Sequence, residues 1–173
     1  MKTIIKSKKF LLRPIVRSDK KSLIRNINDR SIYKYTLTIP YPYTSKDADK
    51  WIRHCLNLKR KKKLTEVNFV IDIDGNLIGG IGLTKIEKHK AEIGYWIGKK
   101  HRNKGVISEA IKLVTSFAFK KLRVVRVYAR INPKNKASAR VLEKNGYKFE
   151  GIMRKNILKD GEFIDGASYA KVR

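Results

Sequence analysis

One continuous stretch, Ala91–Lys121, constrains the fold more than any other part of the chain. Its first segment, Ala91–Ile97, alternates aromatic and β-branched residues with others and predicts a strand. Apolar residues recur at helical spacing from Gly105 onward and predict a helix. A short basic loop, Lys99–Lys104, joins the two segments. A strand, a tight loop and a helix start direct unpaired N–H groups and the positive end of a helix dipole at one point, which predicts a phosphate site.

The loop and the start of this helix carry a motif that resembles a known family. The motif reads Arg102-Asn103-Lys104-Gly105-Val106-Ile107. It resembles R/Q-x-x-G-x-G/A, the pyrophosphate loop of the GNAT acyl-CoA N-acyltransferases, and departs from it at Ile107, where a small residue is usual. The resemblance implies that backbone N–H groups from Arg102 to Ile107 bind the pyrophosphate of acetyl-CoA (coenzyme A), and that Arg102 and Lys104 add positive charge.

A second motif, Asn135–Tyr147, reads N-K-A-S-A-R-V-L-E-K-N-G-Y. It resembles the GNAT pattern N-x-x-S-x-R-V-L-E-K-x-G-F/Y, in the form typical of the branch that contains the ribosomal-protein-alanine N-acetyltransferases. Shorter matches extend the resemblance over nearly the whole chain: Leu11, Arg13 and Pro14 at the start, and Glu150, Gly151, Arg154, Asp160 and Gly161 near the end. The resemblance implies an α/β GNAT-like fold, with a mixed, mostly antiparallel central sheet and helices on both faces.

Hydrophobic periodicity and turn residues predict the other elements. Strands are expected at Lys8–Ile15, Thr65–Ile73, Leu77–Ile86, Val125–Ile131, Tyr147–Ile152 and Glu162–Ala170, and helices at Ser18–Asn28, from Ser45 onward and at Asn135–Lys144. Asp74-Gly75-Asn76 predicts a hairpin, and Gly79, Gly80 and Gly82 predict a bulge or a close neighbour in its second strand. No repeat or linker interrupts the pattern, so we expect one domain, residues 1–173, with its core at about 8–172.

Two polar or irregular stretches have two interpretations each. Ile32–Thr44, with two prolines among four tyrosines, is expected to be an irregular loop. Its aromatic residues either cover the core or form a wall of the acceptor site, which the GNAT family often builds from this region. The basic run Lys59–Lys63 suits a helix C-terminus, and nucleic-acid contact is the alternative.

The composition excludes several classes of protein. No apolar run approaches the ~20 residues of a membrane span, so no membrane association is expected. The charged segment Met1–Lys9 lacks a signal-peptide core, and the single Cys55 excludes an internal disulfide. His89 and His101 lack metal-ligand spacing, so no metal site is expected. These features predict a cytoplasmic protein, and they leave monomer and dimer open.

The net charge of +27, with a sequence pI near 10.3, is extreme. It reflects either a compositional bias spread over the surface or a polyanionic partner, such as RNA, a ribosome or the phosphates of coenzyme A. Such a charge repels small polycations and therefore counts against a polyamine acceptor.

Acetyl transfer from a thioester to an amine needs a neutral amine, a donor for the developing oxyanion and a proton for the departing thiolate. Glu92, in mid-strand on one face with Gly94 and Trp96, is the candidate base, and an ion pair with a nearby cation is its structural alternative. Ser138 is the candidate acid, because the tyrosine that many relatives carry at the position of Leu142 is absent.

The remaining candidate residues would contact the cofactor. Asn135 either hydrogen-bonds the pantetheine arm or caps its helix. A strand N–H near Trp96 or Ile97 would stabilise the oxyanion.

Three functions are therefore considered. The leading one is an acetyl-CoA-dependent N-acetyltransferase that acts on a protein or peptide N-terminus, for example that of a ribosomal protein. The second keeps the chemistry but uses a small amine, an amino acid or an antibiotic. The third is a basic RNA- or ribosome-binding module with a decayed acyl-CoA site.

Overall fold

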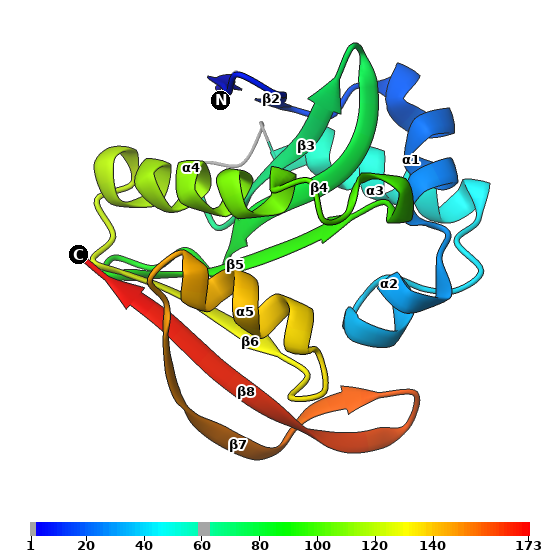
Figure 1. Cartoon of the computed structure of the whole chain (residues 1–173). Helices are drawn as coiled ribbons and strands as arrows, with labels where there is room; N and C mark the ends of the chain where they lie inside the picture. Colours follow the sequence, from blue (N-terminus) through cyan, green and yellow to red (C-terminus); the bar gives the residue numbers. More distant parts are fainter. Residues whose placement is uncertain (1–2, 59–62) are drawn as a thin grey trace.

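The computed structural model describes residues 3–58 and 63–173, so that most of the basic run Lys59–Lys63 and the first two residues lie outside the described part. Its strands form one sheet of eight in the order β1-β2-β3-β4-β5-β6-β8-β7 (Figure 1). They are β1 (Ile5–Lys6), β2 (Leu11–Arg13), β3 (Val67–Ile73), β4 (Asn76–Thr84), β5 (Lys90–Ile97), β6 (Arg126–Ile131), β7 (Lys148–Lys159) and β8 (Glu162–Val172). The helices are α1 (Lys20–Ile27), α2 (Arg30–Tyr35), α3 (Ser45–Leu58), α4 (Val106–Lys121) and α5 (Lys136–Lys144), with 3-10 turns η1 (Arg17–Asp19) and η2 (Lys99–His101).

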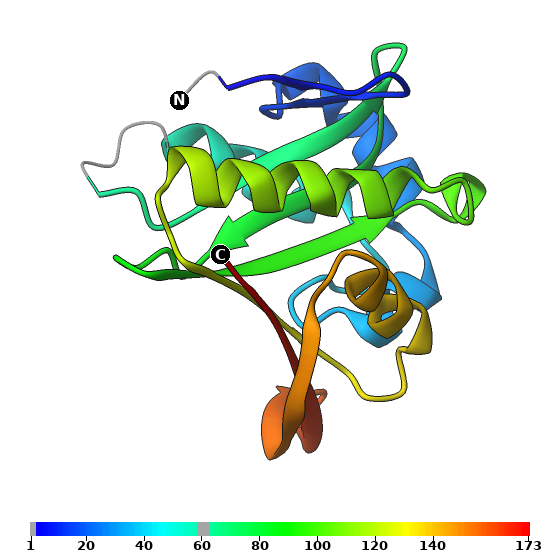
Figure 2. The same cartoon turned by 60° about the vertical axis from the view of Figure 1, so that its left-hand side comes forward.

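Helices cover both faces of this sheet, as the sequence predicts (Figures 1 and 2). One core packs α4 against side chains that include Phe69 and Ile71 of β3. The other core packs α1 and α3 against Val70 and Leu77. Because side chains alternate along a strand, neighbouring residues of β3 belong to different cores. All neighbouring strands are antiparallel except β5 and β6, which confirms the mixed, mostly antiparallel sheet.

The parallel pair β5–β6 is short, and this feature positions the site. The two strands are in register only from Lys90↔Arg126 to Glu92↔Tyr128. Beyond Glu92, β5 keeps its ladder with β4, and β6 keeps its ladder with β8. The two strands therefore diverge, as Figure 1 shows, and the last five residues of β5 have no ladder partner on this side within the described residues.

The β3–β4 hairpin confirms the prediction for its glycines. A bulge interrupts the register between Ile71 and Asp72, opposite the second strand's start. A Cβ at Gly79 would lie 2.7 Å from the Trp96 carbonyl oxygen, and a Cβ at Gly80 would lie 2.6 Å from the Trp96 indole nitrogen. The glycines therefore allow β4 and the Trp96 backbone and side chain to approach closely.

Three sequence predictions need correction. The stretch expected to be irregular begins within a helix, α2, whose first turn is capped by Asp29. The expected first strand is shorter, Leu11–Arg13, and pairs with an additional strand, β1. The last two strands extend further than the sequence predicts and form a hairpin that reaches Lys159 and Glu162. No helix among the described residues is long and apolar enough to cross a lipid bilayer.

Candidate active site

The loop after β5 leads the backbone into α4 through two left-handed residues. Asn103 and Gly105 have φ angles of 61° and 75°. Gly105 is the N-cap of α4, and within the described residues no side chain caps this helix end. A Cβ at Gly105 would meet nothing within 4 Å, so the glycine is needed for its backbone angle and the space beside it is open. The first N–H groups of α4, starting at Val106, are therefore available to a ligand.

The surroundings of this helix start are electropositive. Burial, followed by the neighbouring cations Lys104, Arg25 and Lys100, lowers the pKa of His101. The Lys104 side chain is exposed beside the helix start. Free N–H groups, a helix dipole and an unshielded ammonium fit the pyrophosphate of coenzyme A. Ile107, the residue that departs from the loop pattern, packs its side chain against the core on the α4 side.

The Arg102 side chain contacts the first turn of α2. Its guanidinium donates to the Ser31 hydroxyl at 2.9 Å and lies 3.7 Å from the Asp29 carboxylate. It also contacts the Ile97 carbonyl oxygen at 3.4 Å. The positive charge that the sequence assigns to a phosphate is thus shared with Asp29, and Arg102 connects the loop to the first turn of α2.

Glu92 lies in a charged cluster. Arg130 donates two hydrogen bonds, both at 2.9 Å, to the two carboxylate oxygens. Lys85 adds an ion pair at 3.0 Å. Burial disfavours the charged carboxylate, but the hydrogen bonds from Arg130 and Lys85 outweigh it, and the pKa of Glu92 is lowered. Glu92 is on β5 and Arg130 is on β6, so this pair spans the strands at the point where they diverge.

The two faces of β5 present different chemistry. Glu92 and Trp96 share a face, and Trp96 packs with the α1–α3 core. Tyr95 points to the other face, where its hydroxyl lies 2.7 Å from the Ser138 hydroxyl of α5. Burial raises the pKa of Tyr95 to about 12, although the hydrogen bond with Ser138 opposes this. Both hydroxyls of the pair therefore keep their protons near neutral pH.

Asn135 caps α5, as one of its two interpretations predicts. Its side-chain oxygen accepts a hydrogen bond from the Ser138 backbone N–H at 3.1 Å. This cap places Ser138 in the first turn of α5, where it is buried and faces β5. The Asn135 amide nitrogen is not used in the cap, so capping and ligand contact are compatible.

A pocket of about 370 Å³ lies between the segment after α2 and the β7–β8 hairpin. It is lined by Tyr33, Leu37, Thr38, Ile39, Pro40, Tyr41, Leu158, Lys159 and Asp160. The Lys159 ammonium donates to the carbonyl oxygens of Tyr33 and Thr36 at 2.8 and 2.9 Å, and it fixes the hairpin to α2. Part of the stretch Ile32–Thr44 therefore lines a cavity, while Ile32 and Tyr43 are buried in the core.

The family model of the acetyltransferase (GNAT) domain matches residues 9–148. The chain belongs to the GNAT acetyltransferases. Over 168 residues it is 29% identical to the "Uncharacterized N-acetyltransferase YnaD" of Bacillus subtilis, covering 96% of this chain and 95% of the relative. It is 42% identical to the "Probable N-acetyltransferase YjcK" of the same organism, but that match spans about half of each protein, 53% and 52%.

Solved structures share this fold along the whole chain. An acetyltransferase of Bacillus anthracis superposes with a TM-score of 0.83 at 28% identity and covers 98% of both chains. RimL, a ribosomal L7/L12 α-N-protein acetyltransferase solved with coenzyme A, has a TM-score of 0.87 at 21% identity, also over 98% of both chains. The chain is therefore an acetyl-CoA-dependent N-acetyltransferase with the GNAT fold.

Relatives are named for different acceptors. The "Putative ribosomal N-acetyltransferase YdaF" of Bacillus subtilis is 34% identical over 102 residues, which cover 58% of this chain and 56% of that protein. The spermidine N(1)-acetyltransferase of Escherichia coli is 23% identical over 154 residues, which cover 88% and 80%.

Sequence reasoning did not identify the partners of the candidate residues. Tyr95 lies within the strand segment that carries the family resemblance, and its alternation with Glu92 and Trp96 places it on the opposite face. Arg130 follows from the register of β5 and β6, which a single sequence does not specify. Asp29 and Ser31 lie about 70 positions from Arg102 in the chain and carry no local signal.

Proposed function

We propose that this enzyme acetylates the α-amine of a polypeptide N-terminus, that a ribosomal protein is the acceptor, and that the whole chain acts as one domain. A ribosomal acceptor would place the enzyme in the cytoplasm. The choice of acceptor rests mainly on one observation, the engagement of Glu92 by Arg130 and Lys85.

A carboxylate that is held by two cations is a weak base. The lowered pKa of Glu92 means that it gains a proton less readily than an ordinary glutamate. An enzyme without a strong base is best suited to an amine that is already partly neutral. A polypeptide α-amine, with a pKa of about 7.8, is about 14% neutral at pH 7, whereas a lysine amine of pKa about 10.4 is only about 0.04% neutral.

We assign the acceptor to the pocket between the segment after α2 and the β7–β8 hairpin, and its lining supports the same choice. Asp160 is the single carboxylate among the residues that line it, so the pocket lacks the several carboxylates that the ammonium groups of a polyamine would need. The net charge of +27 further disfavours a polycation. The aromatic side chains Tyr33 and Tyr41 provide apolar surface for the first side chains of a peptide.

In the proposed reaction, residues on the two faces of β5 have different roles. Acetyl-CoA supplies the acetyl group as a thioester, which an amine attacks directly. The N–H groups at the start of α4 and Lys104 bind its phosphates, and Asn135 contacts its pantetheine arm. A backbone N–H near Trp96 or Ile97 stabilises the negative oxygen. The Ser138–Tyr95 pair holds a hydroxyl proton for the departing sulfur. Glu92 and Arg130 fix the distance between the strands.

Two matched peptides test the acceptor class. Both carry one lysine, and one has a free α-amine while the other is acetylated there. We expect kcat/KM to be at least about a hundredfold higher for the peptide with the free α-amine, in line with the difference in neutral fraction. Equal acetylation of both peptides, or faster acetylation of spermidine or of free amino acids, would contradict the proposal.

Purified ribosomes test the ribosomal acceptor. After incubation with the enzyme and acetyl-CoA, intact-protein mass spectrometry should show one ribosomal protein that gains a single acetyl group at its N-terminus. Acetylation of the short peptides without any modified ribosomal protein would retain the N-terminal specificity and reject the ribosomal substrate.

A further inference from the structure

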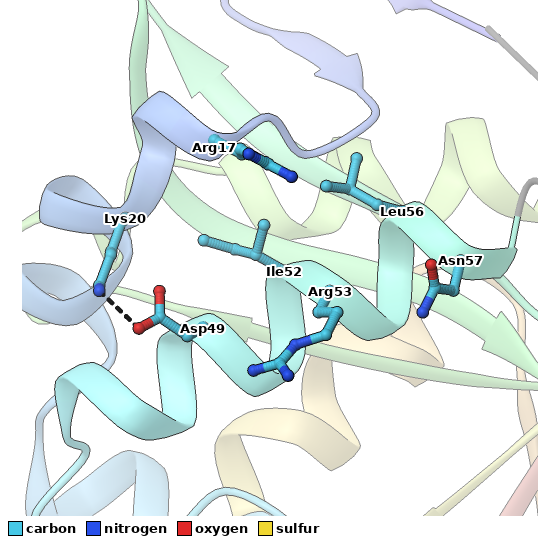
Figure 3. Close-up of a pocket in the computed structure, with 7 residues that line it drawn as sticks. All are labelled: Arg17, Lys20, Asp49, Ile52, Arg53, Leu56 and Asn57. Atoms are coloured by element: carbon cyan, nitrogen blue, oxygen red, sulfur yellow. Dashed lines mark hydrogen bonds and ion pairs between the residues drawn. The ribbon is translucent and has the colours of Figure 1, made fainter.

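A larger cavity, of about 720 Å³, lies between η1–α1 and α3 (Figure 3). Its lining consists of Arg17, Lys20, Asp49, Ile52, Arg53, Leu56 and Asn57. We call this cavity the α1–α3 groove. Nothing in the proposed acetyl transfer uses any of these residues.

The groove combines free cations with an apolar floor. Among the described residues, neither Arg17 nor Arg53 has an ion-pair or hydrogen-bond partner for its guanidinium, and both are exposed. Lys20 is paired with Asp49 at 2.7 Å, which leaves the lining with a net positive charge. Figure 3 shows Arg17 extending from η1 toward Leu56 of α3, with Ile52 beside it.

Further cations lie along the two helices that form the walls. On α1, Lys21 is exposed next to Lys20. On α3, exposed cations recur at helical spacing, at Lys46, Lys50 and Arg53. Two walls with charge of one sign focus the field between them and attract a polyanion.

The groove also lies on a suitable side of the molecule. α1 and α3 cover the face of the sheet opposite α4, and this face carries the side chains of Glu92 and Trp96. The helix start that fits the cofactor phosphates belongs to α4. An acceptor that approaches Glu92 from its own face therefore arrives on the side where the groove lies.

We propose that the α1–α3 groove binds the phosphate backbone of RNA and so holds the enzyme on the carrier of its acceptor. Arg17 and Arg53 contact phosphates, for which a planar guanidinium is well suited, and the half-buried Leu56 contacts ribose or base surfaces. The identity of this RNA as ribosomal rests on the proposed function, whereas the binding of RNA to the groove does not.

The test compares two double variants that lose the same charge. Arg17→Ala/Arg53→Ala removes the free cations of the groove, and Lys120→Ala/Lys121→Ala removes two exposed cations at the C-terminal end of α4. Fluorescence anisotropy measures binding of a labelled oligouridylate from low to physiological salt. We expect the groove variant to bind about tenfold more weakly or worse, and the control variant to stay within about twofold.

The salt dependence provides a second readout. Because each lost phosphate contact in single-stranded RNA lowers the slope of log K against log salt by about 0.7, the groove variant should show a slope that is smaller by about 1.4. If both variants lose RNA affinity equally, the loss reflects the net charge of the protein and not the groove, which would overturn the proposal. Absence of RNA binding by the unmodified protein at low salt would also overturn it.

Two further arms separate the alternatives. Polyglutamate of matched charge should bind more weakly than the RNA; binding that is as tight and as dependent on Arg17 and Arg53 would instead identify an acidic protein partner. Acetyl-CoA should raise the melting temperature of both variants equally, which shows that they fold. If RNA binds in the groove but no ribosomal protein is acetylated, the inference stands and the proposed acceptor fails.

Discussion

The Glu92 carboxylate is shared between Arg130 and Lys85, and this sharing decides what it contributes. Burial would favour the protonated form, but the two cations overcome it and lower the pKa of Glu92 below its ordinary 4.5. A lowered pKa stabilises the folded protein above pH 4.5, and this stabilisation is lost as the pH falls through the folded-state value.

The substitution Glu92→Gln separates the ion-pair role from a role as general base. At pH 7 it should lower the free energy of unfolding by about 1–3 kcal/mol, because it leaves the half-buried Arg130 and the exposed Lys85 without their carboxylate. The difference from the unmodified protein should disappear in acid, below pH 4.5. Urea unfolding across a pH series measures it.

Turnover gives the decisive comparison for the same variant. With an N-terminal peptide amine at pH 7 to 8, kcat should fall by less than about tenfold. A fall of about 10²–10⁴-fold that recovers at high pH, where the amine is neutral, would establish Glu92 as the general base and reject our interpretation.

At the scale of elements, α2 is a six-residue helix that depends on its neighbours. Short helices are marginal by themselves, and this one is capped by Asp29 and tied to the cofactor loop through Arg102. Its other end is tied to the β7–β8 hairpin through Lys159. The helix next to the proposed acceptor pocket is therefore held at both ends.

The substitution Ser31→Ala should weaken the acceptor site without weakening the cofactor site. Losing one hydrogen bond to a charged group costs about 1.5 kcal/mol or more, so we expect the KM for the peptide to rise about tenfold. The Kd for acetyl-CoA should stay within about twofold. Ser22→Ala in α1 is the matched control. An increase in the Kd for acetyl-CoA with an unchanged peptide KM would show that Arg102 serves the phosphates instead.

The sequence predicted those turns and helix ends that depend on residues close together in the chain. The Asp-Gly hairpin, the Gly105 start of α4 and the Asn135 cap of α5 each depend on residues within a few positions. α2 was missed because its local signal, the Asp29 cap, is followed by only six helical residues, which also depend on tertiary ties to Arg102 and Lys159. The Glu92–Arg130 and Tyr95–Ser138 contacts were missed because they depend on the β5–β6 register and on the docking of α5.

For the whole molecule, binding of acetyl-CoA should raise the free energy of unfolding. Acetyl-CoA at about 100 times its Kd should stabilise the fold by about 2.7 kcal/mol, which differential scanning fluorimetry detects as a higher melting temperature. Gly105→Asp should abolish this increase, because it places a side chain at a φ of 75° and a negative charge at the phosphate site.

Gly75→Asp is the matched control for that experiment. Gly75 has a φ of 76°, and a Cβ there would also meet nothing within 4 Å, but it lies in the β3–β4 hairpin. The substitution Gly75→Asp therefore introduces the same backbone strain and the same negative charge in the hairpin and not at the start of α4. If both variants lose the response to acetyl-CoA, or if the unmodified protein shows none, the helix start is not the cofactor site.

The short pairing of β5 with β6 divides the sheet by chain order. Strands up to Ile97 form one contiguous half and strands from Arg126 onward form the other, and three register pairs join their backbones. The chain segment that contains α4 connects these two halves covalently. The ion pair between Glu92 and Arg130 lies at the point where the two halves separate. We expect a molecule that binds between β5 and β6 beyond Glu92 and Arg130 to contact both halves of the sheet, so that substrate binding also holds the two halves together.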